Sequence, residues 1–206
     1  MAYNLNPTPG DLATARATVE RVLDGCEREL PTDRSVSVAL GWSDEEVVVD
    51  DFAGAMGVCL GSDRVELLFS SRGTDWSRAL AAAAARQYGR AWLRGEFPDG
   101  SRLFWWQDLL EAAAGERLVE RVADPGVAPW ASLDVATMQP WWPAVEASLG
   151  APVDEPMVDS EEGEAVPAFL AEGIGAVLAA ELDLGVDAFP SATRSDVEAA
   201  LARAFE

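Results

Sequence analysis

The stretch LAAAAARQYGRAW, residues 80–92, decides the fold that the sequence predicts for this chain. It is rich in alanine, the residue with the strongest helix preference, and Gly95 ends the pattern soon after it. Thr74 or Asp75 can cap its start, so we expect a long helix from about residue 74 to residue 94. Residues four apart on a helix share a face. Arg86 and Arg90 should therefore project from one side of an otherwise apolar helix.

These two arginines need partners if the helix is buried, because an unpaired buried charge is costly. The next predicted helix runs from about residue 104 to residue 122 and carries Glu111 and Glu116. We expect one of these glutamates to pair with the arginines. The alternative is that both guanidinium groups extend to solvent from a face that is only half covered.

The other elements follow from hydrophobic periodicity and turn residues. Residues 51–61 read as a glycine-rich connection or a hairpin, and residues 124–129 as a turn. Residues 154–164 read as an acidic loop, and Ser195 with Glu198 forms a capping box before the last helix. Short strands are expected at 35–41, 46–49 and 65–70, and further helices at about 9–30, 143–149, 167–182 and 195–206. The stretch between the turn at 124–129 and the helix at 143–149 reads as irregular or short-helical.

Composition places strong limits on partners. The chain has 206 residues, enough for one domain, and we expect a single domain over residues 1–206. It holds 36 acidic and 15 basic residues, all of the latter arginine, for a net charge of −21. This composition resembles that of proteins from salt-accumulating archaea, whose carboxylate repulsion is screened by salt. We expect instability at low salt, and no binding of nucleic acid or anionic membranes, since no basic patch is present.

Cys26 and Cys59 lie outside any CxxC pattern, and the N-terminus has no charged region followed by an apolar one. No apolar run is long enough to cross a membrane. Two thiols are therefore favoured over a disulfide, and a cytoplasmic location is the simplest expectation.

The order of elements around residues 80–92 resembles an uncharacterised group of predicted zinc-dependent proteases of the gluzincin type. In that family a helix reads like HEYHH and a following helix supplies a third ligand in an EGLAE-like segment. The matching stretches here are residues 80–92 and 108–119, preceded by VELLFS (65–70) and followed by PAFLAEGIG (167–175). The resemblance covers roughly residues 35–205. It implies an α+β fold with a small, mostly antiparallel sheet, a helical majority and a zincin-like central pair of helices.

The departures from this family remove its chemistry. Zinc peptidases use two histidines four apart and an adjacent glutamate as general base. Arg86 and Arg90 stand at the ligand positions and cannot lose a proton to bind zinc, and Gln87 cannot act as a base. The third ligand position falls on Ala112. The whole chain contains no histidine.

The resemblance therefore implies a degenerate, catalytically silent relative with no metal and no cofactor. Its cleft would bind an unknown peptide or protein partner. The degenerate site positions are Arg86, Gln87, Arg90 and Ala112, and the candidate binding residues are Arg86, Tyr88, Arg90, Glu111 and Glu116. The alternatives are a structural or interaction domain with no cleft function and, less favoured, an enzyme that uses carboxylates or a metal site without histidine. A groove beside the second helix would favour the binding domain, and a filled interior the structural one.

Other candidate chemistries are weaker. The pairs Trp105-Trp106 and Trp141-Trp142 are more typical of core anchors than of a sugar or peptide site. The acidic residues at 50–51 and 159–164 lack an EF-hand pattern, so solvated loops are favoured. The chain has neither GxSxG nor a P-loop, and no histidine that could activate either cysteine.

Overall fold

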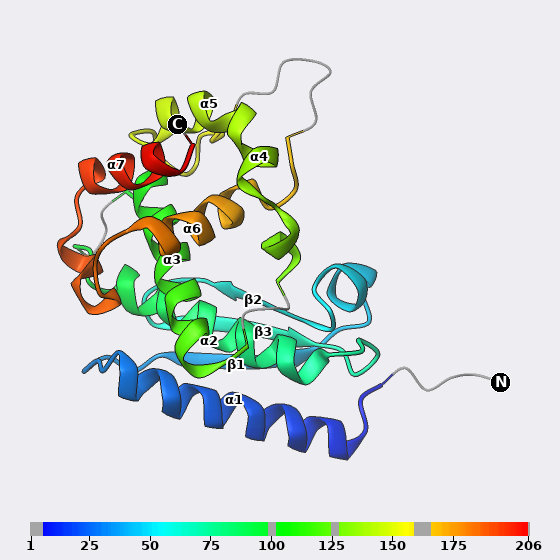
Figure 1. Ribbon diagram of the computed structural model, residues 1–206. Helices are drawn as coiled ribbons and strands as arrows, with labels where there is room; N and C mark the ends of the chain where they lie inside the picture. The colour runs from blue at the N-terminus through cyan, green and yellow to red at the C-terminus, as the bar shows by residue number, and fades with distance from the viewer. Residues whose placement is uncertain (1–5, 99–101, 125–127, 159–165, 206) are drawn as a thin grey trace.

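The computed structural model describes residues 6–98, 102–124, 128–158 and 166–205. A three-stranded sheet lies beside a larger set of helices, with α1 along one side of the molecule and α4 to α7 gathered on the opposite side (Figure 1). The strands are β1 (Ser37–Trp42), β2 (Ala55–Cys59) and β3 (Arg64–Phe69). The helices are α1 (Pro9–Glu29), α2 (Trp76–Arg94), α3 (Trp105–Val122), α4 (Val135–Met138), α5 (Trp142–Ser148), α6 (Leu170–Glu181) and α7 (Arg194–Phe205), with the short turns η1 (Val47–Asp51), η3 (Pro129–Ser132), η4 (Gln139–Trp141) and η5 (Val186–Ser191).

The sheet has the order β1-β3-β2, which makes β2 an edge strand. The predicted α+β class is confirmed. The prediction of a mostly antiparallel sheet holds only for β2 and β3, because β1 pairs with β3 in parallel and the sheet is mixed. The hairpin interpretation of residues 51–61 is also confirmed, since β2 lies inside that segment and pairs antiparallel with β3.

The strand predicted at 46–49 is wrong. Residues Val47–Asp51 form a π-helical turn, in which the Phe52 N–H donates to the Val47 carbonyl at 3.1 Å. Val48 is fully buried, and its carbonyl accepts from the Gly54 N–H at 2.8 Å. Packing of this one side chain, together with the chain reversal into β2, outweighs the β preference of the valines.

Helix α2 lies at the centre of the fold. It packs against β2 and β3 on one side and against α1 and α3 on others. Every residue from Ala79 to Ala85 is buried, and small side chains allow these elements to approach closely. The approach to α3 is close, since a Cβ added at Gly89 would lie 2.9 Å from both the Ala114 carbonyl oxygen and the Gly115 Cα.

The last helix begins one residue earlier than predicted and has a different cap. Its N-terminal box is formed by Thr193 and Asp196: the Thr193 N–H donates to the Asp196 carboxylate at 2.8 Å, and the Asp196 N–H donates to the Thr193 hydroxyl at 3.3 Å. Ser195 and Glu198, the predicted box, lie inside the helix, where Glu198 pairs with Arg194. Both residue pairs fit the box spacing, and Thr193 is the one that lies outside the helix.

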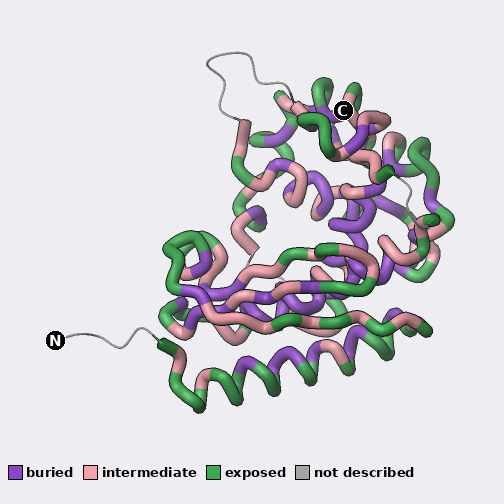
Figure 2. The backbone as a smooth tube through the Cα atoms, turned by 180° about the vertical axis from the view of Figure 1, so that it is seen from behind, coloured by how far each residue is buried: buried purple, intermediate pink, exposed green. Residues whose placement is uncertain are grey.

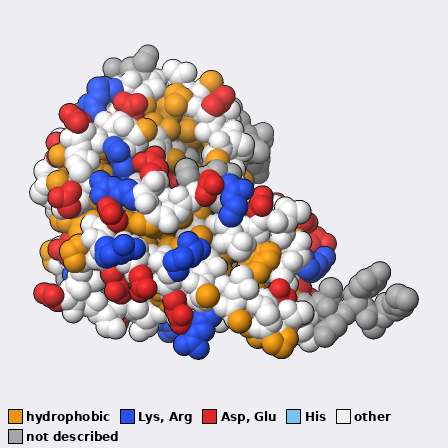
Figure 3. All heavy atoms as spheres, turned by 60° about the horizontal axis from the view of Figure 1, so that its bottom comes forward, with side chains coloured by type: hydrophobic (Ala, Val, Ile, Leu, Met, Phe, Trp, Pro, Cys, Tyr) orange, Lys and Arg blue, Asp and Glu red, His pale blue; other side chains and the backbone are white. Residues whose placement is uncertain are grey.

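Buried side chains form one continuous core that runs from α1 through α2 and α3 to α6 and α7. Figure 2 shows the buried backbone concentrated inside, while the outer side of α1 is exposed. Acidic and arginine side chains are interspersed on the face shown in Figure 3. None of the helices in the described residues combines the length and apolar character needed to cross a membrane. Residues 125–127 of the predicted turn and residues 159–164 of the predicted acidic loop lie outside the described residues.

Candidate functional site

A cleft of about 340 Å³ opens between the edge strand β2 and the helices α2, α3 and α6. Its floor is formed by the arginine-bearing face of α2. One end lies near Cys59 and Arg94, and the other end is aromatic. The lining residues are Phe52, Met56, Gly57, Val58, Cys59, Arg86, Gln87, Arg90, Arg94, Asp108, Ala112, Glu116, Trp130 and Glu172.

The prediction that Glu111 or Glu116 pairs with the arginines is confirmed for Arg86. Its Nε donates to Glu116 Oε1 at 2.6 Å, and the two side chains are only 8% and 13% exposed. Arg86 therefore does not extend to solvent. Arg90 pairs instead with Asp108, through Nη2 and Oδ1 at 2.7 Å.

Glu111 binds Arg94, a third arginine that sequence reasoning missed. Arg94 Nε donates to Glu111 Oε1 at 2.9 Å, and the Glu111 side chain is 0% exposed. Arg94 follows Arg90 by four residues, so the same helix periodicity that grouped Arg86 with Arg90 could have found it. The result is a row of three arginines on α2, each paired with a carboxylate of α3.

Burial governs the electrostatics of this row. It raises the pKa of Glu111 to about 6, although the hydrogen bond and charge of Arg94 act in the opposite direction. Burial alone would lower the pKa of Arg90, but the nearby charges of Asp108, Glu111 and Glu172 raise it overall. Arg90 and Arg94, whose pKa values are raised, therefore stay cationic, and the raised pKa of Glu111 brings its titration closer to neutral pH.

The aromatic end of the cleft is coupled to the first ion pair. Trp130 Nε1 donates to Glu116 Oε1 at 3.0 Å, and the Arg86 guanidinium lies 4.8 Å from the centroid of the same indole ring. Phe52 and Phe169 complete the group, with their ring centroids 5.3 Å apart. No local sequence pattern indicates this cluster, because its members lie far apart along the chain.

The remaining predicted residues are Gln87 and Tyr88 on α2 and Ala112 on α3. Gln87 and Ala112 line the cleft. Tyr88 does not: it is buried on another side of α2, where its hydroxyl donates to the Leu30 carbonyl at 2.9 Å. Placing Tyr88 among the binding residues was therefore wrong, because a helix turns by about 100° per residue and carries the neighbour of Gln87 away from the cleft.

The edge strand β2 presents backbone groups to the cleft. The Ser70 N–H donates to the Gly54 carbonyl at 2.7 Å, and the Leu60 N–H donates to the Arg64 carbonyl at 2.9 Å. In an antiparallel pair, residues alternate between those bonded to the neighbouring strand and those whose N–H and C=O point away from it. Gly57, an odd number of residues from both Gly54 and Leu60, therefore directs its N–H and C=O away from β3.

The other outward-facing residues of β2 are partly occupied. The Ala55 N–H donates to the Phe52 carbonyl at 3.1 Å, and the Cys59 carbonyl accepts from Arg94 Nη1 at 3.4 Å. The two ends of the free edge are thereby held in place. Gly57 lies between them as the centre of the free edge.

The residues of this cleft do not fit a zinc site. The two positions that would hold histidines carry arginines bound to carboxylates, and Gln87 is uncharged. Within the described part of the chain, no cluster of three histidine, cysteine or acidic residues is arranged to hold a metal ion. The carboxylate that faces this row from a separate element is Glu172 of α6, which sequence reasoning missed.

The cysteines carry no activated thiol. Cys26 and Cys59 are both free, as predicted, with Cys26 buried and Cys59 half-buried. Burial raises the pKa of Cys26 to about 12 and also raises that of Cys59. A nucleophilic cysteine needs a lowered pKa, so neither residue fits that role.

No protein-family model, curated protein or solved structure matches this chain.

Proposed function

We propose that this protein is a catalytically inactive, zinc-peptidase-like domain that binds an extended peptide segment of a partner protein along β2. The observation that carries the proposal is the open cleft beside α2, between the free edge of β2 and the paired arginine row. A cleft of this size argues against a purely structural domain, for which a filled interior was expected.

The chemistry of the cleft supports binding without catalysis. Arg86 and Arg90 are held by Glu116 and Asp108, so these carboxylates are engaged and the arginines offer no metal ligand. Gln87 stands where the general base of a zinc peptidase would be, and an amide cannot accept the proton of an attacking water.

The edge strand supports an extended ligand. An added strand gains affinity from main-chain hydrogen bonds and specificity from alternate side chains. The N–H and C=O of Gly57 supply such a pair of bonds at the middle of the cleft. Val58, the next residue on the strand, also lines the cleft and is 44% exposed.

We place this activity in the cytoplasm, since the two free thiols are typical of a reducing compartment. We also propose that the protein needs high salt for stability, because the self-repulsion of a net charge of −21 disfavours the compact state when it is not screened.

Peptide binding can be tested directly in multimolar KCl. An array of fluorescein-labelled heptapeptides with an alanine–valine frame and every residue type at the centre would be screened by fluorescence anisotropy. The strongest binder would then be N-methylated at one residue at a time. Strand addition predicts an affinity loss of about tenfold or more at the residue facing Gly57 and little effect at its two neighbours, whose N–H groups point away.

Two variants complete this test. Gln87→Trp fills the cleft floor and should abolish binding, whereas Val135→Trp adds the same indole to exposed α4 and should leave binding unchanged. Failure of every peptide to bind, or an N-methylation scan without alternation, would refute the proposal.

A further inference from the structure

The charges around the cleft do not balance. Arg86, Arg90 and Arg94 face four carboxylates, since Glu172 joins Asp108, Glu111 and Glu116. Of these four, the three carboxylates of α3, Asp108, Glu111 and Glu116, are each bound to an arginine. Glu172 is the cleft carboxylate that makes no hydrogen bond or ion pair with any described residue, although its charge acts through space on Arg90.

Glu172 is held in a defined position on the wall of the cleft. It lies in the first turn of α6, where a carboxylate is also favoured by the helix dipole. The next residue fixes the helix against its neighbours: a Cβ added at Gly173 would lie 2.8 Å from Met138 Sδ. Glu172 is half-buried, so this residue is partly removed from solvent.

The geometry of β2 determines which ligand side chain can reach this carboxylate. A Cβ added at Gly57 would lie 2.7 Å from Gln87 Cγ, so the side-chain direction at Gly57 points toward α2. Directly opposite residues of an antiparallel pair send their side chains to the same face of the sheet. The ligand residue opposite Gly57 would therefore direct its side chain toward α2, into the cleft whose lining includes Gln87, Arg90 and Glu172.

We propose that the ligand of this cleft is a peptide with a lysine or arginine opposite Gly57, whose cation is bound by Glu172. This inference rests on the proposed peptide-binding function and specifies its ligand. One cation brings the four carboxylates and the three arginines to neutrality. An acidic side chain would instead add a second unpaired negative charge to a partly desolvated site, which is unfavourable.

The surroundings of the cleft favour the same ligand. The whole chain carries a net charge of −21, so its field attracts a cationic segment at long range when salt is low. At high salt that attraction is screened, but a half-buried pair at contact distance is screened much less. Recognition should therefore persist in multimolar KCl.

Three heptapeptides that differ only at the central residue, arginine, glutamine or glutamate, provide the test. Their dissociation constants would be measured by fluorescence anisotropy in multimolar KCl. We expect the arginine peptide to bind about tenfold more tightly than the glutamine peptide, the size of effect typical of a charge-assisted hydrogen bond. The glutamate peptide should bind most weakly.

The variant Glu172→Gln should remove the advantage of the arginine peptide and leave the affinity of the glutamine peptide unchanged. Glu120→Gln, which makes the same change of charge at an exposed position of α3, should keep that advantage. Far-UV circular dichroism would verify that both variants are folded. Equal binding of the arginine and glutamine peptides, or an arginine preference that survives in Glu172→Gln, would overturn the assignment while leaving peptide binding intact. Absence of binding by all three peptides would overturn both proposals.

Discussion

Glu111 shows how a single side chain ties the cleft to the core. It is fully buried on α3 and holds Arg94, and Arg94 in turn donates to the carbonyl of Cys59 on β2. One carboxylate thus links α3, α2 and the edge strand. Breaking such a buried pair by removing one partner is strongly destabilising, because the other charge is left uncompensated.

The raised pKa of Glu111 predicts a pH dependence of stability. Its folded pKa of about 6 lies above the ordinary value of 4.5, so the folded protein binds this proton more tightly than the unfolded chain does. The stabilisation that this tighter proton binding provides is fully present below about pH 4.5 and is lost as the pH rises through 6. The free energy of unfolding should therefore fall by about 2 kcal/mol across this window. Urea unfolding measured across the same pH window should show that Glu111→Gln lacks this decrease in the free energy of unfolding.

The matched control for this experiment is Glu20→Gln. Glu20 is 60% exposed in a surface pair with Arg16, and such pairs contribute little to stability. The free energy of unfolding of Glu20→Gln should therefore change with pH as it does in the unmodified protein. An unchanged pH dependence in Glu111→Gln would contradict the prediction.

At the scale of elements, the position of the cleft depends on the close crossing of α2 and α3. Gly89 and Gly115 lie at this crossing, where a Cβ on Gly115 would come within 2.8 Å of the Arg86 carbonyl oxygen. Backbone contact between the helices brings the carboxylates of α3 within reach of the arginines of α2. A larger separation would lengthen the ion pairs along the row.

Gly89→Ala should therefore destabilise the protein. Alanine would gain up to about 1 kcal/mol in helix preference, but its Cβ would meet backbone atoms of α3 that cannot move aside, and overpacking costs about 1–3 kcal/mol. We expect a lower midpoint of urea unfolding. Gly10→Ala is the control, because among the described residues a Cβ added at this exposed position of α1 would have only Thr8 Oγ1 within 4 Å, at 3.6 Å. This substitution should be neutral or stabilising.

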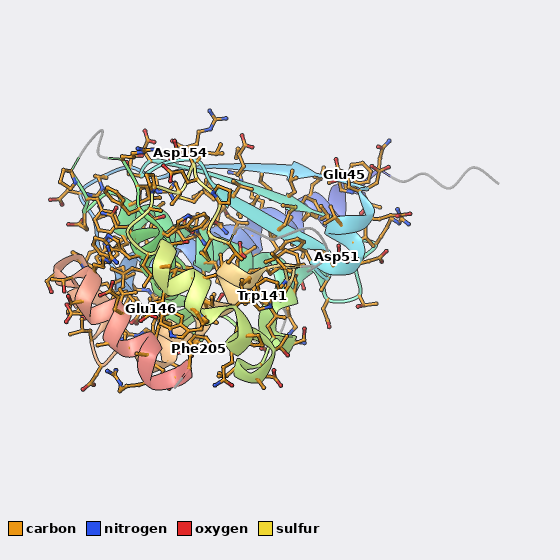
Figure 4. The ribbon with its side chains drawn as sticks, turned by 90° about the horizontal axis from the view of Figure 1, so that it is seen from above. Glu45, Asp51, Trp141, Glu146, Asp154 and Phe205 are labelled. Atoms are coloured by element: carbon orange, nitrogen blue, oxygen red, sulfur yellow. The ribbon has the colours of Figure 1, made fainter. Side chains whose placement is uncertain are left out.

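At the scale of the whole molecule, charge is the dominant feature. Glu45 and Asp51, near η1, lie at one end of the molecule, and Glu146 and Asp154 lie at the opposite end (Figure 4). The carboxylates are thus distributed around the fold, and ions from solution weaken the repulsion that the 15 arginines leave uncompensated.

Stability should consequently rise with KCl. Thermal unfolding followed by circular dichroism should show a melting temperature that increases from low salt to multimolar KCl, most steeply at the low end where screening changes fastest. A neutral osmolyte at the same osmolality is excluded from the protein surface but does not screen charges. It should therefore raise the melting temperature less than KCl does. A melting temperature independent of KCl would contradict this expectation.

The site could be predicted only where local geometry decides it. Helix periodicity placed Arg86 and Arg90 on one face, and the cost of an unpaired charge pointed to a carboxylate of the next helix, which proved to be Glu116 for Arg86. The same reasoning could not choose Asp108 for Arg90, since that choice depends on how far α2 and α3 are shifted along each other.

The sequence by itself determined the α+β class, the bounds of the long helices and the absence of histidine-based chemistry. These follow from composition and from periodicities that act within a few residues. Only the tertiary structure decided that β1 pairs parallel to β3, that the valines at 47–49 turn rather than extend, and that Glu172 faces the arginine row. Each of these depends on contacts between residues far apart in the chain, whose energies are set by packing and burial and leave no local pattern.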